Sequence, residues 1–241
     1  MRSLVLVLLP WALVLGLCAG CGDWAYPRLS LDTHPVLNFG FLPYSDEGHM
    51  RGLFNALTAH LGEHTKIEYR FILTPDYQTM GRLMGNRMVD LAWFTPASYA
   101  MIGKKVGAQA LCKPYRRGGH GYRPIIVVVK GSPVKTLAEL RGKRFAYVDR
   151  NSTSGFVMPN RMLAEIGVTN PLTFFSSVDF TFSHVASLVG LKDGRYDAAA
   201  VYEGAPQDTA AKLGADTFRV LKAGREVPND PIVARAGLDK A

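Results

Sequence analysis

The chain has 241 residues, of which 48% are hydrophobic and 20% are charged, and its formal net charge is +8. These apolar residues are ample for a packed core and are compatible with one two-lobed unit. The positive charge suits an anionic ligand or surface. No basic run is interleaved with aromatic residues, so a nucleic acid is not an expected partner. The pairs Lys104-Lys105 and Arg116-Arg117 are short, and we expect them to be solvated.

The N-terminal sequence predicts export. An apolar run from Leu4 to Leu17 follows a weakly basic start and is too short to cross a bilayer comfortably. Ala19-Gly20-Cys21 resembles the lipobox of bacterial lipoproteins, although Cys18 stands where Leu is usual. We therefore expect residues 1–21 to be a lipoprotein signal peptide, Cys21 to be lipidated as the first mature residue, and residues 22–34 to be a tether.

The three cysteines predict no disulfide in the mature chain. The spacing of Cys18 and Cys21 also fits a redox or metal CxxC motif, but inside an export signal a processing site explains it better. Processing leaves Cys112 without an intramolecular partner, so the core alone has to hold the exported protein together.

Residues 35–130 are predicted to form a first lobe in which strands and helices alternate. Such alternation favours a largely parallel sheet wrapped by helices. Asp76 is a plausible N-cap for the helix that follows it. The predicted strands are 36–41, 67–73, 89–94, 108–113 and 122–130, and the predicted helices begin near 51, 76 and 95.

Residues 131–222 repeat the pattern and are predicted to form a second lobe, and residues 223–241 are expected to return to the first. Two α/β lobes joined by a long crossing strand describe a hinged clamshell. The predicted strands here are 144–148, 172–175, 198–202 and 218–221, and the predicted helices are 136–140, 154–166, 181–191 and 206–213.

The turn Asn151-Ser152-Thr153-Ser154-Gly155 joins a predicted strand to a predicted helix. Unpaired N–H groups and the positive dipole end of a helix start favour an anion, and hydroxyl groups can hydrogen-bond its oxygens. A single hydroxyl there would be explained as a helix cap. Three consecutive hydroxyls followed by Gly exceed what a cap needs, so we interpret this turn as an oxyanion site.

The order of several motifs resembles the phosphonate/phosphite-binding proteins of ABC transporters, over roughly residues 36 to 235. The motifs are modest one by one, but their order and spacing are specific. They are Asp76-Tyr77, residues 89–99, Ser152–Gly155 with Pro159, His184–Leu188 with residues 194–200, and Val227–Pro231.

The resemblance implies an α/β fold of the type II periplasmic-binding-protein class, a two-lobed clamshell in which each lobe is a mostly parallel sheet flanked by helices. It implies a monomeric solute-binding component of an importer, not an enzyme, without cofactor or metal. The protein would sit in the periplasm or at the extracytoplasmic membrane face, held there by its lipid anchor. It would capture a small oxyanion, a phosphonate or phosphite, and deliver it to an inner-membrane permease.

Carried over by position, the family's binding residues fall on the hydroxyl turn and on five further residues. Ser152, Thr153 and Ser154 would hold the oxyanion, Tyr77 and Tyr122 would line the cleft, and His184 would reach the anion. Glu203 and Asp230 stand where aminoalkylphosphonate binders place acids around the amine. This sequence departs from the family at Thr95, where Gly is usual, and at Ala241, where relatives continue through a further helix.

Several of these residues also have a structural explanation. His184 lies among apolar residues and could be a partly buried structural histidine; as a ligand contact, its near-neutral pKa would suit an anion when charged. Tyr77 is as easily a helix-start residue, and Glu203 a solvated acid, although both follow strands where α/β proteins bind ligands. Trp93 and Phe94 end a buried strand and are expected in the core.

Three other functions were weighed. Ser154, His184 and Asp197 invite a serine-hydrolase interpretation, but no G-x-S-x-G elbow is present. A ligand-sensing lobe that reports to a partner is a second alternative. Residues 60–64 match the HxxEH pattern of some zinc peptidases; Gly62 weakens that helix, which is expected to end there without a third ligand, so no metal site is predicted.

Overall fold

The computed structural model describes residues 36–42 and 47–238. The predicted signal peptide, the tether and Cys21 therefore lie outside the described residues. Among the helices that are described, none combines the length and the hydrophobicity that crossing a membrane requires.

The strands and helices follow one another in the alternating order that the sequence predicts. The strands are β1 (Val36–Phe41), β2 (Glu68–Leu73), β3 (Leu91–Trp93), β4 (Gln109–Cys112), β5 (Gly121–Tyr122), β6 (Pro124–Val129), β7 (Arg144–Tyr147), β8 (Ser177–Phe180), β9 (Ala198–Tyr202), β10 (Phe218–Ala223), β11 (Val227–Pro228) and β12 (Ile232–Ala234). The α-helices are α1 (Glu47–Thr65), α2 (Tyr77–Gly85), α3 (Pro96–Ser98), α4 (Met158–Ala164), α5 (Pro171–Phe174), α6 (His184–Lys192), α7 (Ala205–Asp208) and α8 (Ala210–Leu213). Two π-helical turns, η1 (Tyr99–Gly103) and η3 (Thr153–Val157), and a 3₁₀ turn, η2 (Ala138–Leu140), complete the set.

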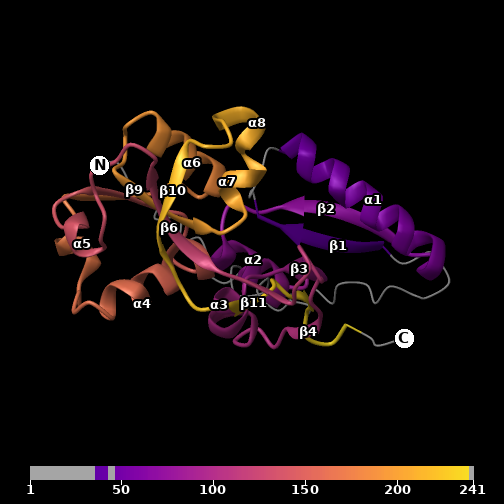
Figure 1. Cartoon of the computed structure of the whole chain (residues 1–241). Helices are drawn as coiled ribbons and strands as arrows, with labels where there is room; N and C mark the ends of the chain where they lie inside the picture. Colours follow the sequence, from indigo (N-terminus) through magenta and orange to yellow (C-terminus); the bar gives the residue numbers. More distant parts are fainter. Residues whose placement is uncertain (1–35, 43–46, 239–241) are drawn as a thin grey trace, which may run out of the picture. The chain divides into compact units, whose positions relative to one another are not determined.

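The strands build two five-stranded sheets, each with helices packed against it (Figure 1). The first sheet has the order β2-β1-β3-β12-β4, and the second has the order β10-β6-β9-β7-β8. This is the predicted α/β class with two lobes, and we call each sheet with its helices the first and the second lobe.

Each sheet is mixed, because strands that arrive from the other lobe run against their neighbours. In the first sheet β1 pairs in parallel with β2 and β3, whereas β12 is antiparallel to β3 and β4. In the second sheet β7 is parallel to β8 and β9, whereas β6 is antiparallel to β9 and β10. Parallel pairing thus holds for the βαβ units.

Two details of the predicted chain path were wrong. β6 belongs to the second sheet, so the chain changes lobe before Pro124 and not near residue 130. Residues 172–174 belong to the helix α5 and not to a strand, because Asn170 caps the helix and Pro171 occupies its first turn; Phe175 follows the helix. The strand of that unit lies slightly later, at β8.

Alternating side chains give the first sheet two apolar faces. Phe39 and Phe41 point to one face and pack with Met50 and Phe54 of α1. The other face packs against α2 and η1. Gly40 lies on that second face, where an added Cβ would come within 2.3 Å of the sulfur of Met80, so only glycine allows α2 to approach this closely.

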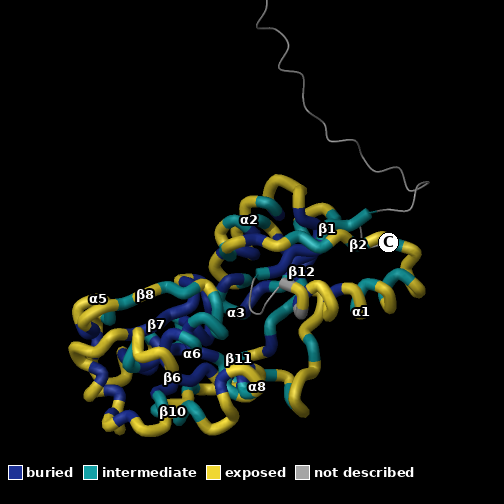
Figure 2. Tube along the Cα trace, turned by 90° about the horizontal axis from the view of Figure 1, so that it is seen from above, coloured by how far each residue is buried: buried dark blue, intermediate teal, exposed yellow. Residues whose placement is uncertain are grey.

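The second sheet also has two apolar faces, and its strands are more fully buried than those of the first sheet (Figure 2). In β6, Ile126 and Val128 face α4, whereas Ile125 and Val127 face α6 and α8. The continuous apolar run of β6 is therefore explained by burial on both faces.

The chain crosses between the sheets twice, and the two crossing segments pair with each other as the ribbon β5–β11. The buried side chain of Asn229 fixes this ribbon, since its Nδ2 donates to the carbonyl oxygens of Pro114 (2.9 Å) and Gly119 (3.1 Å). Tyr122 lies on β5 and Asp230 follows Asn229, so both depend on the ribbon for their positions.

We predict that Asp90→Ala destabilises the fold by about 3 kcal/mol, because it leaves the guanidinium of Arg235 unpaired in a largely buried place. The Asp90 carboxylate accepts from Arg235 Nε (2.7 Å) and from the backbone N–H of Asn38 (2.9 Å), which ties the end of β12 to β1. The two charged side chains are only 10% and 15% exposed. Urea unfolding measures the effect.

The control is Glu68→Ala, whose partner Arg70 and the Glu68 side chain itself are about 60% exposed. Loss of that pair should change the unfolding free energy by less than about 1 kcal/mol. Equal losses of unfolding free energy in the two variants would show that the buried Asp90–Arg235 pair stabilises the fold no more than an exposed ion pair does.

Candidate functional site

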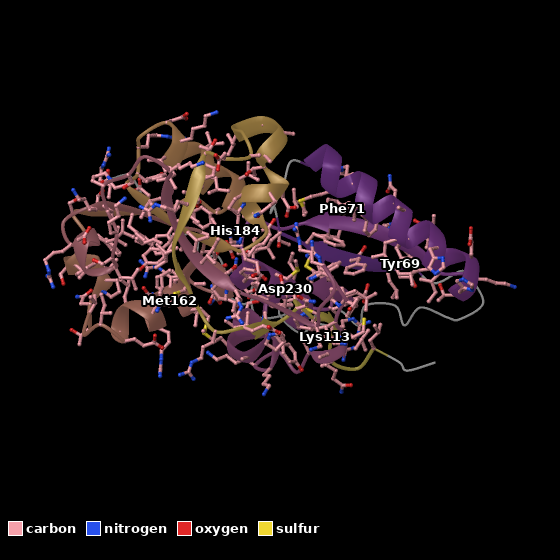
Figure 3. The ribbon with its side chains drawn as sticks, in the orientation of Figure 1. Tyr69, Phe71, Lys113, Met162, His184 and Asp230 are labelled. Carbon is pink, nitrogen blue, oxygen red and sulfur yellow. The ribbon has the colours of Figure 1, made fainter. Side chains whose placement is uncertain are left out.

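Residues of both lobes and of the ribbon line one cleft with a volume of about 490 Å³. Seven of the eight residues predicted to form the site line it, namely Tyr77, Tyr122, Ser152, Ser154, His184, Glu203 and Asp230. Figure 3 shows two of them, His184 from α6 and Asp230 from the segment after β11. These residues are far apart in the sequence, and they meet in one cleft because the chain crosses between the lobes twice.

The hydroxyl turn is built by hydrogen bonds within itself. Asp149 Oδ1 accepts the N–H of Asn151 (2.6 Å), and Ser152 Oγ accepts the N–H of Gly155 (3.0 Å). Ser152 therefore caps η3 while its oxygen still faces the cleft. An added Cβ at Gly155 would lie 2.5 Å from the Cβ of Val148, so glycine is required for the turn to fold back on its strand.

Thr153 differs from its two neighbours. Its Oγ1 accepts the N–H of Ala97 in the first lobe (2.8 Å), and the residue is not among those that line the cleft. The expectation that all three hydroxyls face one ligand is not supported by this arrangement. Thr153 instead uses its hydroxyl to join the turn to the start of α3.

Thr95, where the family pattern has Gly, forms the other half of that junction. It caps α3 in a capping box with Ser98, and its Oγ1 donates to the carbonyl oxygen of Asn151 (3.2 Å). Its side chain is buried between the lobes and also lines the cleft. The added side chain therefore contacts the opposite lobe directly.

Two tyrosines and one acid form a polar group next to the hydroxyl turn. Tyr122 Oη donates to Asp230 Oδ1 (3.3 Å), and the same hydroxyl is hydrogen-bonded to Ser154. Burial raises the pKa of Tyr77 and of Tyr122 well above the usual value, and the nearby Asp230 raises both further. Both phenols consequently stay protonated. Tyr122 already donates its one proton to Asp230, so Tyr77 is the phenol that can donate to an anion.

The carboxyl group of Asp230 is the most perturbed acid of the cleft. Burial raises its pKa from 3.8 to about 7, against the opposing effects of the Tyr122 hydrogen bond and of Arg116. Burial also raises the pKa of Asp149, beneath the hydroxyl turn. An empty cleft thus holds acids that gain from a cationic neighbour.

His184 lies at the start of α6 with its ring edge-on to Tyr202, at 4.9 Å between ring centroids. Its Nδ1 is buried and has no hydrogen-bond partner within the described chain. Burial lowers the pKa of His184 to about 4, so the imidazole is neutral near pH 7. The predicted ligand contact of His184 stays a prediction, in which a neutral ring nitrogen or N–H would face the ligand.

The hydrolase triad does not assemble. The Asp197 carboxylate is bound by Arg144, through Nε (3.1 Å) and through a second guanidinium nitrogen (2.8 Å). His184 Nδ1 therefore lacks the carboxylate that orients the base in a triad.

Glu203 is exposed at the end of β9 and is already partly engaged. Its Oε1 accepts the N–H of Arg123 (3.0 Å), and its own N–H donates to the carbonyl of Arg123 (2.9 Å). One carboxylate oxygen is consequently used to hold β9 against the crossing segment, and the other remains at the edge of the cleft.

Sequence reasoning missed several residues that line the cleft. Trp93 was expected in the core, but the strand ends at the cleft and only Phe94 is fully buried. Arg116 and Arg117 are exposed, as expected, but they also line the cleft, and Arg117 pairs with Asp208 of the second lobe. The basic pair between two predicted strands was the available signal.

The sheet topology and the cleft define a two-lobed binding protein of the type II periplasmic class, and solved structures agree. A binding protein component of an ABC phosphonate transporter from Pseudomonas aeruginosa superposes with a TM-score of 0.78 at 20% identity, covering 86% of this chain and 70% of that one. A Prochlorococcus marinus protein in complex with methylphosphonate gives a TM-score of 0.73 at 21% identity, covering 84% and 77%.

The chain belongs to the family described as ABC transporter, phosphonate, periplasmic substrate-binding protein, whose model matches residues 39–241. The phosphonates-binding periplasmic protein of Escherichia coli K12 is 23% identical over 89% of this chain. A phosphate-import protein of Mycolicibacterium smegmatis is 25% identical over 80% of it. The chain spans 65% and 62% of the lengths of these two relatives.

We predict that Asp230→Asn stabilises the ligand-free protein increasingly as pH rises. Because the pKa of Asp230 is raised to about 7, the folded chain holds a proton that the unfolded chain has released, and this contribution to stability is lost as pH rises towards 7. Relative to wild type, the variant should gain about 2 kcal/mol between about pH 5 and about pH 8. Denaturant unfolding at both pH values measures this gain. A constant difference would show that the carboxyl ionises without a penalty.

Proposed function

We propose that this protein is the solute-binding component of an ABC importer and captures a phosphonate, phosphite or related oxyanion in the cleft. The observation that carries the proposal is the convergence of the hydroxyl turn, two protonated tyrosines and a raised-pKa acid on one cavity of about 490 Å³. Binding needs only matched donors and a closing cleft.

The oxyanion binds at the turn. Ser152 and Ser154 face the cleft, and the N–H groups of Thr153 and Ser154 belong to the first turn of η3, where a helix has no preceding carbonyl for them. The protonated phenol of Tyr77, which also lines the cleft, supplies a further donor. Neutral His184 supplies another polar contact from α6.

The acids of the cleft support a ligand with a positive group. Burial raises the pKa of Asp230 despite the hydrogen bond from Tyr122 and the nearby Arg116, and an ammonium beside it would favour its ionised form. Glu203 adds a second carboxylate at the edge of the cleft. Aminoalkylphosphonates carry both charges on one small molecule, so they are the substrate class that uses both the turn and the acids.

A role in transport is supported by family membership together with the predicted signal peptide and lipid anchor. The protein works as a monomer in the periplasm or at the outer face of the membrane, anchored through Cys21, and delivers its ligand to an inner-membrane permease. Permease and ATPase genes beside this one would favour import; a neighbouring sensor kinase gene would favour a sensing role.

The first test is a ligand panel read by thermal shift. Ligand that binds only the folded state stabilises it by about 2.7 kcal/mol at a hundredfold excess over Kd, a rise of about 5–10 °C in Tm for a chain of this size. Aminoethylphosphonate, methylphosphonate and phosphite should give larger shifts than phosphate, sulfate or amino acids. A shift with amino acids alone would contradict the proposal.

Calorimetric titration of the leading ligand tests whether the hydroxyl turn binds it. Ser154→Ala should weaken binding of the leading ligand by about 1.5–3 kcal/mol, since it removes a hydrogen bond to a charged group. Ser176→Ala, an exposed serine outside the cleft, is the matched control and should bind like wild type. Unchanged affinity in Ser154→Ala would remove this hydroxyl from the site.

Anchoring is tested on the mature protein from membranes. We expect mass spectrometry to find an N-terminus at Cys21 that carries acyl chains, because stable anchoring takes two or more lipid chains. An unmodified chain that begins elsewhere would exclude the anchor and leave the cleft proposal untouched.

A further inference from the structure

The C-terminal part of α1 brings together three side chains that the cleft does not use. His60, Glu63 and His64 are all exposed, and one potential ligand atom from each lies within 4.8 Å of the other two. Among the residues that the structure describes, this is the one group of three or more histidine, cysteine or acidic side chains placed in this way. The two imidazole rings meet edge to face, at 4.9 Å between centroids.

The arrangement follows from helical geometry. Residues three and four apart lie on one face of an α-helix, so positions 60, 63 and 64 share a face for as long as the helix continues. α1 extends to Thr65. The sequence-based argument against a metal site assumed that the helix ends near Gly62, and the structure removes that assumption.

We propose that His60, Glu63 and His64 form a surface site for Zn²⁺. Two imidazoles and one carboxylate are borderline donors, a set that suits zinc better than Mg²⁺ or Ca²⁺, which prefer oxygen ligands. Tetrahedral zinc at about 2.0–2.1 Å from each donor needs the donors about 3.4 Å apart. Small side-chain rotations of exposed residues close the remaining gap.

The position on the helix favours a cation. The three residues lie in the last two turns of α1, where the unpaired carbonyl groups give the helix end a partial negative charge. Glu63 supplies a further negative charge, and no lysine or arginine lies between His60 and Thr65, the end of the helix. Three protein ligands leave the fourth tetrahedral position open to water.

The test is calorimetric titration of zinc chloride into the mature chain from residue 22 onward, without a histidine tag and with Cys112 alkylated so that its thiol cannot bind zinc. Wild type should bind one equivalent. His60→Ala and His64→Ala should each weaken binding by at least about 10-fold, the lower end of the loss seen when even an outer-shell partner of a metal site is removed. Glu63→Gln should also bind more weakly.

His120→Ala is the matched control, because His120 is exposed and packs only against Tyr115 among the ring contacts of the described chain. It should bind zinc like wild type. Circular dichroism checks that the variants keep their helices. Absence of zinc binding by wild type, or equal binding by wild type, His60→Ala and His64→Ala, would overturn the proposal. Neither result bears on oxyanion binding in the cleft, which involves other residues.

Discussion

The ribbon β5–β11 is the constraint on which the binding cleft depends. It contains both crossings of the chain, and the buried amide of Asn229 holds it through two carbonyl oxygens. At Gly121 an added Cβ would meet Val227 O at 2.6 Å, so the two crossing segments approach as closely as backbones can. Because Tyr122 and Asp230 lie on or beside this ribbon, their positions in the cleft depend on it.

The electrostatics of the cleft place an anion-binding turn beside a buried acid. The turn offers hydroxyl groups and the N–H groups of a helix start, which stabilise negative charge. Tyr122 is hydrogen-bonded both to Ser154 of the turn and to Asp230, whose pKa burial raises to about 7. A simple anion at the turn would sit near this acid, whereas a zwitterion would also bring the positive group that favours the ionised carboxylate.

The sequence predicted the parts of this structure that local rules decide. Asp76 caps α2 as expected, and the continuous apolar run of β6 corresponds to a strand buried on both faces. It could not predict which sheet β6 joins, because an apolar strand buried on both faces looks the same in either sheet. That Arg116 and Trp93 line the cleft could not be predicted either, because it depends on the positions in space of the hairpin that carries Arg116 and of the end of β3. The shift of the predicted strand at 172–175 came from overlooking the cap at Asn170.

Thr153 shows how binding and closure share one turn. Its hydroxyl accepts from Ala97 of the first lobe, while the carbonyl oxygen of Asn151 accepts from Thr95. Two such hydrogen bonds contribute about 1 kcal/mol each, too little to hold two lobes closed by themselves against thermal opening. A ligand shifts the equilibrium only by the interactions it makes better in the closed form. Ser154 lies next to Thr153 on the same turn, so an oxyanion bound at Ser154, as we propose, would stabilise the conformation in which Thr153 meets the other lobe.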